Sequence, residues 1–177
     1  MVDHIPVMLI TGPIGVGKTT VAAEVSELLD KAGVAHALVD IDTLRWCYPR
    51  PPHDPFRLEL AMKNLAAIWN NFQEVGATRL VLATVLESRD DLEWYRGAIP
   101  GADILVIRLH ASLHTLRSRV EQREVGSGLD RHLRRAAELT TLMERNKVEN
   151  ILVNTEGKSV ATLAREILDC SNWTKVL

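Results

Sequence analysis

The sequence has little cysteine and no long apolar run. Only two of its 177 residues are cysteines, Cys47 and Cys170, and they form neither a CxxC pair nor a metal-ligand spacing. A disulfide framework is therefore not expected, and both thiols are expected to be buried or half-buried in the reducing cytoplasm. No apolar run reaches the length of about 20 residues that a bilayer-spanning helix needs, so we expect no membrane association.

An excess of charge of one sign is also absent. The chain has 21 Lys and Arg residues against 23 Asp and Glu residues, a formal net charge of -2. Such a protein has no general positive field for nucleic acid or anionic lipid, so it must capture an anion at a local site. Residues 1–10 lack the basic region and cleavage site of a secretory signal, which again favours the cytoplasm. No pattern predicts an oligomeric state.

Apolar segments of strand length alternate with longer segments of helical periodicity. This alternation is typical of βαβ units that build a parallel sheet, and the length suits a single domain with one core over residues 1–177. The predicted strands are 7–11, 35–41, 80–85, 104–109 and 151–153. The predicted helices are 18–32, 56–75, 113–123, 130–148 and 160–168, with Gly33 and Gly76 ending the first two and Ser159 capping the last. Residues 48–55 and 124–128 are predicted loops.

A glycine-rich segment connects the first predicted strand to the first predicted helix. It matches G-x-x-x-x-G-K-[ST], the phosphate-binding P-loop, in the strand, loop and helix context that this motif requires. Its backbone N–H groups and the helix start would bind phosphate oxygens, Lys18 would reach the β- and γ-phosphates, and Thr19 would supply a hydroxyl ligand to Mg²⁺. A glycine turn without a ligand is disfavoured, because these residues coincide by chance in roughly one chain per hundred. The predicted nucleotide-binding residues of the loop are Gly12, Pro13, Ile14, Gly15, Val16, Gly17, Lys18, Thr19 and Thr20.

Asp40, Asp42 and Arg45 stand at the end of the second predicted strand. Ligands of open α/β sheets bind at the carboxyl ends of the strands, so both carboxylates are predicted to lie near the γ-phosphate. If the strand stays extended through Ile41, the two aspartates point to the same side. Phosphoryl transfer to a hydroxyl needs one acid beside the metal and another that orients or deprotonates the attacking oxygen. In the alternative interpretation Asp42 caps the following turn, and Asp40 and Arg45 are solvated.

The P-loop followed by Asp-x-Asp-x-x-Arg resembles the small-metabolite kinase branch of the P-loop NTPases. The pattern is most like that of adenylylsulfate kinases, and shikimate kinases, gluconate kinases and chloramphenicol phosphotransferase-like proteins share the plan. The resemblance implies a three-layer α/β/α fold with a five-stranded parallel sheet in the order 2-3-1-4-5. It also implies an acceptor-binding region at about 42–76 and a helical lid at about 117–135. The substrates of these kinases cannot be carried over, because their Phe-Ile-Ser-Pro-like, triple-glycine and Arg-x-Gly-His segments are missing here.

The same resemblance assigns roles to the residues that match the motif. Asp40 would lie beside the metal together with Thr19, because the third predicted strand is followed by no acid until Glu87. Asp42 would contact the acceptor hydroxyl, and Arg45 would hold the acceptor. Trp46 and Tyr48 are predicted to contact the acceptor as well, whereas Trp69 and Phe72 are expected to pack in the core.

Leu116, Arg119 and Arg123 match the L-x-x-R-x-x-x-R pattern that begins the lid in these kinases. By the resemblance, Arg119 would lie near the adenine and Arg123 would meet phosphate oxygens in the transition state. The alternative is a solvent-exposed helix with many charged side chains that pair with one another. In either case a hinge at Gly126, Ser127 and Gly128 is predicted to follow the helix. A basic cluster follows, formed by Arg131, His132, Arg134 and Arg135. It is expected at the surface, and the alternative is that it closes over the acceptor or the nucleotide.

These observations predict an ATP-dependent phosphotransferase that moves the γ-phosphate to a hydroxyl of a small-molecule acceptor. ATP and Mg²⁺ are the predicted cofactors, and Lys18, Asp42 and Arg123 are the predicted catalytic residues. Two alternatives stay open, a nucleotide-dependent regulatory NTPase and a kinase that acts on nucleic-acid ends. The first would need a water-positioning residue and a switch segment, and the acidic charge balance disfavours the second.

Overall fold

Five parallel strands form the centre of the computed structural model, which describes residues 4–54, 56–123 and 128–173. The strands lie in the order β2-β3-β1-β4-β5, and all neighbouring pairs are parallel. The predicted fold class and the strand order 2-3-1-4-5 are therefore confirmed. The bounds are β1 Ile5–Thr11, β2 Ala37–Asp40, β3 Leu80–Ala83, β4 Ala102–His110 and β5 Ile151–Asn154.

The central strand is apolar on both of its sides. Val7, Met8, Leu9 and Ile10 of β1 have no exposed surface, as expected for a parallel strand that is covered by helices on both faces. Successive side chains enter two separate apolar clusters, with Leu9 in one and Met8 in the other. The continuous apolar run of β1 thus divides the core into two layers.

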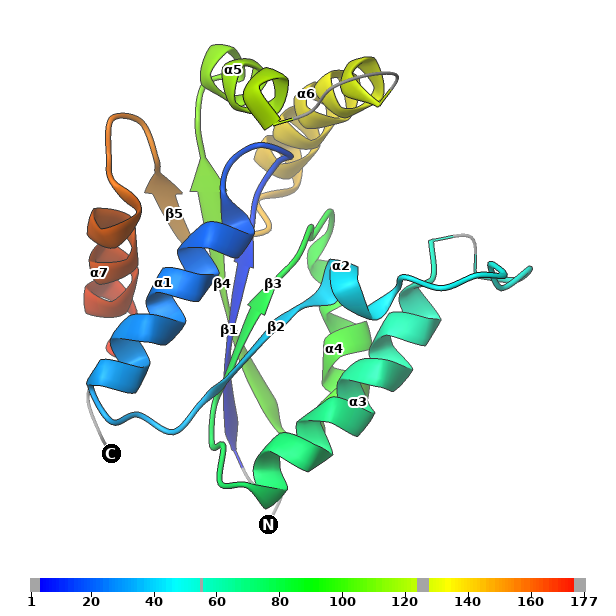
Figure 1. Ribbon diagram of the computed structural model, residues 1–177, viewed down its shortest axis with the longest axis vertical. Helices are drawn as coiled ribbons and strands as arrows, with labels where there is room; N and C mark the ends of the chain where they lie inside the picture. The colour runs from blue at the N-terminus through cyan, green and yellow to red at the C-terminus, as the bar shows by residue number, and fades with distance from the viewer. Residues whose placement is uncertain (1–3, 55, 124–127, 174–177) are drawn as a thin grey trace.

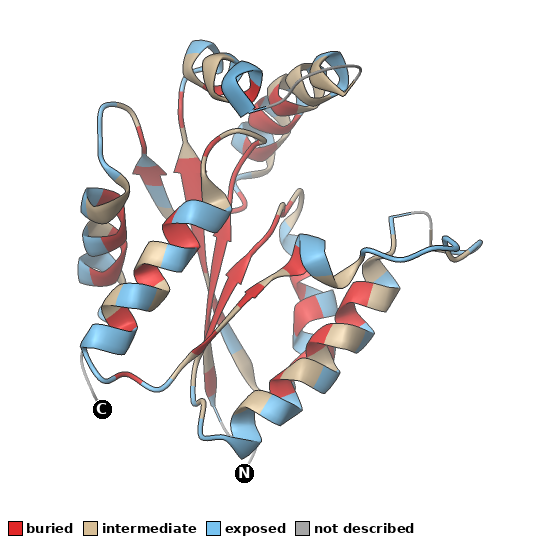
Figure 2. Cartoon of the chain, in the orientation of Figure 1, coloured by how far each residue is buried: buried red, intermediate tan, exposed pale blue. Residues whose placement is uncertain are grey.

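Helices cover both faces of the sheet (Figure 1). On one face α1 (Lys18–Lys31) and α7 (Val160–Ser171) pack beside each other. The other face is covered by α3 (Leu58–Glu74), α4 (Leu92–Ala98) and α6 (Leu129–Asn146). Figure 2 shows the buried residues along the strands and on the helix faces that point toward them. This arrangement is the predicted three-layer α/β/α fold.

Two further helices stand at the carboxyl ends of the strands, where α2 (Ile41–Leu44) follows β2 and α5 (Leu113–Arg123) follows β4. The bounds of α5 agree with the prediction, and Ser159 caps α7 as predicted, accepting a hydrogen bond from the Thr162 backbone. The short helices α2 and α4 and the 3-10 turn η1 (Arg89–Asp91) were not predicted. Their few residues contain too little apolar periodicity to be recognised.

The predicted burial is confirmed for the two aromatic residues that were expected in the core, but not for the two thiols. Trp69 is 2% exposed, and Phe72 is partly buried against the same cluster. Cys47 and Cys170 are both exposed, so the expectation of buried or half-buried thiols is wrong. Within residues 4–54, 56–123 and 128–173, no helix is long and apolar enough to span a membrane.

A buried ion pair fixes β4 to the segment that leads into β5. Arg108 donates from Nε and Nη2 to the two carboxylate oxygens of Glu149 at 2.8 and 3.0 Å. The two side chains are only 5% and 15% exposed. This two-pronged geometry compensates part of the desolvation of both charges, so loss of either partner leaves a buried charge without compensation.

We predict that Glu149→Ala lowers the free energy of unfolding by about 3 kcal/mol, because Arg108 stays buried without its partner. Urea unfolding followed by circular dichroism measures this. Glu27→Ala is the control, because Glu27 pairs with Lys31 across 3.7 Å with both side chains about two-thirds exposed. Equal effects of the two substitutions would contradict the importance of the buried pair.

Candidate functional site

The P-loop runs from the end of β1 to the start of α1, and three of its glycines have a positive φ. The φ angles are 148° at Gly12, 85° at Gly15 and 101° at Gly17. A Cβ at Gly12 would lie 2.6 Å from the Leu109 carbonyl oxygen, and one at Gly15 would lie 2.9 Å from the Leu116 carbonyl oxygen. The loop is therefore pressed against β4 and α5 in a conformation that side chains other than glycine rarely adopt.

Lys18 folds over this loop and is desolvated there. Its Nζ donates to the carbonyl oxygens of Gly12 and Pro13 at 3.0 and 3.2 Å. Burial lowers the pKa of Lys18 from 10.5 to about 8. The carboxylates of Asp42 and Asp40 act in the opposite direction on this pKa, and the charge of Arg123 lowers it. Lys18 and these three side chains therefore influence one another within one electrostatic cluster.

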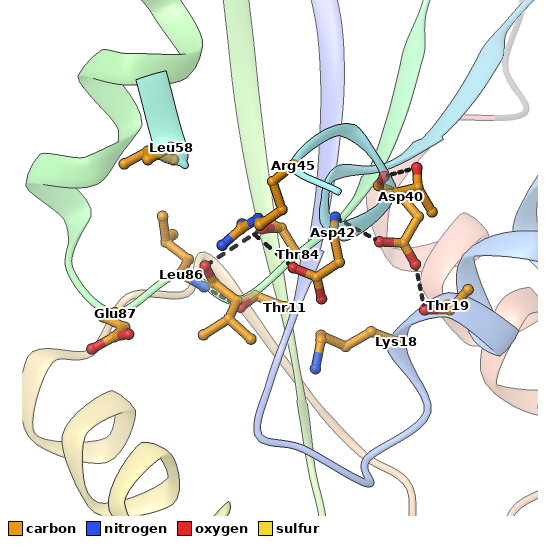
Figure 3. A network of polar contacts seen from close by, with 12 residues as sticks. Thr11, Lys18, Thr19, Asp40, Asp42, Arg45, Leu58, Thr84, Leu86 and Glu87 are labelled. Atoms are coloured by element: carbon orange, nitrogen blue, oxygen red, sulfur yellow. Dashed lines mark hydrogen bonds and ion pairs between the residues drawn. The ribbon is translucent and has the colours of Figure 1, made fainter. Parts of the chain in front are cut away.

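Asp40 connects the P-loop helix to the end of β2 (Figure 3). Its Oδ2 accepts a 2.7 Å hydrogen bond from the Thr19 hydroxyl, and its Oδ1 accepts a 3.0 Å hydrogen bond from the Asp42 backbone N–H. Asp40 is the N-cap of α2, which begins at Ile41, so the expected extended conformation through Ile41 is wrong. The physical reason is the strong preference of aspartate for the N-cap position. Capping, rather than strand periodicity, brings Asp40 and Asp42 together.

The Thr19 hydroxyl and the Asp40 carboxylate are hard oxygen donors, and both residues lie close to Lys18 at the start of α1 (Figure 3). Within the described ranges 4–54, 56–123 and 128–173, no group of three or more His, Cys, Asp or Glu side chains could hold a metal ion. Mg²⁺ fits such a sparse donor set, because it commonly keeps several waters and takes substrate phosphates as ligands. A site that holds a cation tightly by itself is not what these donors provide.

A pocket of about 270 Å³ opens above the P-loop, and we call it the loop pocket. It combines backbone N–H groups of a helix start with two cationic side chains, Lys18 and Arg123, and the carboxylate of Asp42. Such a surface attracts phosphate groups. Its lining residues are Ile14, Gly15, Gly17, Lys18, Thr19, Thr20, Asp42, Val85, Arg123 and His132.

A larger pocket of about 790 Å³ lies directly beside it, and we call it the large pocket. Ile14, Asp42 and Val85 line both pockets, so these residues form their common wall. Arg45 lines the large pocket, and its Nη2 lies 3.4 Å from Asp42 Oδ1. The other lining residues are Phe56, Leu58, Glu87, Ser88, Asp91, Tyr95, Arg135, Leu139, Leu142 and Asn146.

Not all predicted site residues line these two pockets. Arg119 points elsewhere, because its Nη1 donates to the Val16 carbonyl oxygen at 3.3 Å and to the Thr155 hydroxyl at 3.1 Å. Trp46 and Tyr48 are 82% and 95% exposed. None of these three side chains lines the loop pocket or the large pocket, and their roles stay predictions. Of the predicted hinge, Gly126 and Ser127 lie outside the described residues, and Gly128 precedes α6.

The basic cluster at the end of the predicted lid is divided between the surface and the site. Arg131 and Arg134 are exposed as expected. His132 lines the loop pocket, and Arg135 lines the large pocket, where it forms an ion pair with Glu87. His132 and Arg135 are half-buried, and α6 presents them to the pockets, so the surface expectation holds for Arg131 and Arg134 alone within this cluster.

The sequence interpretation also gave no role to Tyr95 or Glu87 in the large pocket. Tyr95 comes from the unpredicted α4, and its hydroxyl lies 3.2 Å from the Thr84 hydroxyl. Burial raises the pKa of Tyr95, so this hydroxyl stays neutral. Glu87 follows β3, where the Leu86 N–H donates to the Thr11 hydroxyl at 2.9 Å and holds the segment against β1. Its place after a strand end was a usable signal for Glu87.

Comparisons with solved structures find the same fold in known kinases. A gluconokinase from Sinorhizobium meliloti has a TM-score of 0.60 at 20% identity, covering 94% of this chain and 92% of that protein. A shikimate kinase from Acinetobacter baumannii has a TM-score of 0.62 at 18% identity, covering 98% of this chain and 96% of that protein. The APS kinase of Mycobacterium tuberculosis in complex with AMPPNP and APS has a TM-score of 0.60 at 21% identity, covering 96% of this chain and 99% of that protein.

These likenesses confirm the predicted resemblance to the small-molecule kinase branch of the P-loop proteins at the level of the fold. A search of curated protein sequences found no match. A protein-family model described as an AAA domain matches residues 8–138, a stretch that includes the P-loop, α2, α5 and the first part of α6. Because this match spans most of the chain, the protein belongs to that AAA-domain family.

Proposed function

We propose that this protein is an ATP-dependent phosphotransferase that moves the γ-phosphate to a hydroxyl group of a small-molecule acceptor with the help of Mg²⁺. The observation that carries the proposal is the position of Asp42 in the common wall of the loop pocket and the large pocket. A hydroxyl group in the large pocket and the terminal phosphate in the loop pocket would then both lie next to the Asp42 carboxylate. Such proximity is the main requirement of phosphoryl transfer.

The P-loop would bind the β- and γ-phosphates through its backbone N–H groups and the start of α1. Lys18 would exchange its hydrogen bonds with the Gly12 and Pro13 carbonyl groups for contacts with phosphate oxygens. Thr19 and Asp40 would hold Mg²⁺, which supplies charge neutralisation on the phosphates when bound. Arg123, in the same pocket as Lys18, would add positive charge where the transition state develops negative charge.

Asp42 would accept the hydrogen bond, and then the proton, of the attacking hydroxyl. Its backbone is fixed by the cap from Asp40, and Arg45 contacts its Oδ1 at 3.4 Å. The second oxygen, Oδ2, would then serve the acceptor. Arg45 thus orients the carboxylate and lines the acceptor side at the same time.

We predict that incubation with Mg-ATP and pooled hydroxyl compounds gives a product that is heavier by one phosphoryl group. The pools contain sugars, sugar acids, nucleosides, aminoglycosides and amphenicols, and mass spectrometry detects the product. Asp42→Asn should lower the turnover by about a hundredfold or more, because general bases contribute about this much. Asp169→Asn, an exposed aspartate on α7, is the matched control. ATP hydrolysis without any phosphorylated compound would contradict the proposal and favour the regulatory NTPase.

We predict that Lys18→Ala weakens ATP binding by about thirtyfold or more in an equilibrium titration, because charge-assisted hydrogen bonds to phosphate are lost. Lys31→Ala serves as the control, since Lys31 pairs with Glu27 at the exposed end of α1. An unchanged affinity in Lys18→Ala would show that the P-loop does not bind the nucleotide.

The affinity for ATP should also depend on pH. The pKa of Lys18 is about 8 in the free protein, and neighbouring phosphates favour its charged form. Above this pH, binding must therefore take up a proton, and the affinity should fall by up to about tenfold for each further pH unit. In Lys18→Arg the guanidinium stays charged, so the slope should disappear. A wild-type affinity that stays constant from neutral pH to about pH 9 would contradict this assignment.

A further inference from the structure

We infer that the large pocket accepts an uncharged or cationic amphipathic alcohol and rejects anionic acceptors such as sugar acids. This inference rests on the proposed phosphotransferase function and adds the chemical class of the acceptor. It is carried by the charges that line the pocket, by the ion pairs that these charges form, and by the apolar surface beside them.

Negative charge exceeds positive charge on the wall of the large pocket. Three carboxylates, from Asp42, Glu87 and Asp91, stand against two guanidinium groups, from Arg45 and Arg135. The remaining polar side chains of the wall, from Ser88, Tyr95 and Asn146, are neutral. A carboxylate, sulfate or phosphate on the acceptor would therefore enter a pocket whose wall carries a formal charge of −1.

Both guanidinium groups already have carboxylate partners. Arg45 lies 3.4 Å from Asp42, and Arg135 forms ion pairs with Glu87 and, at 3.4 Å, with Glu138. An anion that binds either guanidinium group would lie beside these carboxylates, and like charges placed side by side are strongly unfavourable. A cation or a neutral hydroxyl, in contrast, would gain contacts with carboxylate oxygens without breaking a pair.

The acidic wall is held in place by further hydrogen bonds. The Ser88 N–H donates to Asp91 Oδ2 at 3.0 Å, and the Asn146 side chain donates to the Glu87 carbonyl oxygen at 2.7 Å. The segment after β3 is therefore connected both to the start of α4 and to the end of α6. This support favours a preformed wall over one that rearranges around each acceptor.

Apolar side chains form the rest of the pocket, so the acceptor should carry an apolar part as well as its hydroxyl group. The volume of about 790 Å³ suits a medium-sized ligand. The apolar lining comes from the P-loop, from α3 and the residues just before it, from the segment after β3 and from α6. It consists of Ile14, Phe56, Leu58, Val85, Leu139 and Leu142.

Two series of matched compounds test the inference. Phenyllactate, phenyllactamide and the corresponding amino alcohol share a hydroxyl group and an aromatic ring but differ in charge. Gluconate, glucitol and glucamine vary the charge in the same way without an apolar part. Binding of each compound is measured by ligand-observed NMR in the presence of Mg²⁺ and AMPPNP, and turnover is measured separately with Mg-ATP.

We expect the amine and the amide of the phenyl series to bind at least about tenfold more tightly than the acid, and more tightly than the polyols. Glu87→Gln removes one carboxylate of the wall and leaves Arg135 with Glu138 as its remaining carboxylate partner, so it should reduce the discrimination against the acid by about tenfold. Glu166→Gln changes the net charge equally on α7, outside the pocket lining, and should leave the preference unchanged.

Tighter binding of the acids than of the amides and amines would overturn the inference, and so would a complete lack of binding by the neutral and cationic compounds. An unchanged preference in Glu87→Gln would also overturn it, because the wall charge would then not set the selectivity. The binding order tests the acceptor class, whereas transfer of a phosphoryl group tests the proposed function. The two failures can therefore be told apart.

Discussion

The carboxylate of Asp40 is the contact on which the arrangement of the site depends. One of its oxygens accepts from the Thr19 hydroxyl at the start of α1, and the other caps α2 through the Asp42 backbone. A single side chain thus joins the P-loop helix to the end of β2. Because β2 is an edge strand and is paired with β3 alone, this contact helps to hold the acidic turn beside the phosphate-binding loop.

The position of Asp42 follows from this connection. The cap begins a helical turn at the end of β2, and the turn places Asp42 in the wall between the loop pocket and the large pocket. The pKa of Lys18 responds to Asp42, Asp40 and Arg123, so charges from the P-loop, β2, α2 and α5 act on one another. The parallel sheet brings these elements to one edge, as open α/β folds do at the carboxyl ends of their strands.

Local signals made much of this predictable. The P-loop has an obligatory spacing of glycine, lysine and threonine. The apolar runs of strand length, which alternate with helical segments, predict a parallel sheet. The positions of Asp40 and Asp42 near the loop were also expected from sequence, but for the wrong reason. Strand alternation through Ile41 would place the two aspartates on one side, whereas Asp40 caps α2 and ends the strand.

The large pocket was not predictable in the same way, because its wall is assembled from distant segments. Tyr95 lies on a helix too short to show periodicity, and Arg135 looks in sequence like one member of a solvated basic cluster. Only the packing of α6 near the end of β3 brings Arg135 to Glu87. Side-chain pairing across such distances depends on tertiary structure, and no local pattern specifies it.

A crystal structure with Mg²⁺ and AMPPNP tests the central claim most directly, namely that the two pockets form one reaction site. We predict that the β- and γ-phosphates lie in the P-loop, that Lys18 leaves the Gly12 and Pro13 carbonyl groups to bind them, and that the cation lies beside Thr19 and Asp40. The γ-phosphate should face the large pocket across Asp42. A γ-phosphate that points away from Asp42, or a nucleotide bound outside the loop pocket, would contradict the claim.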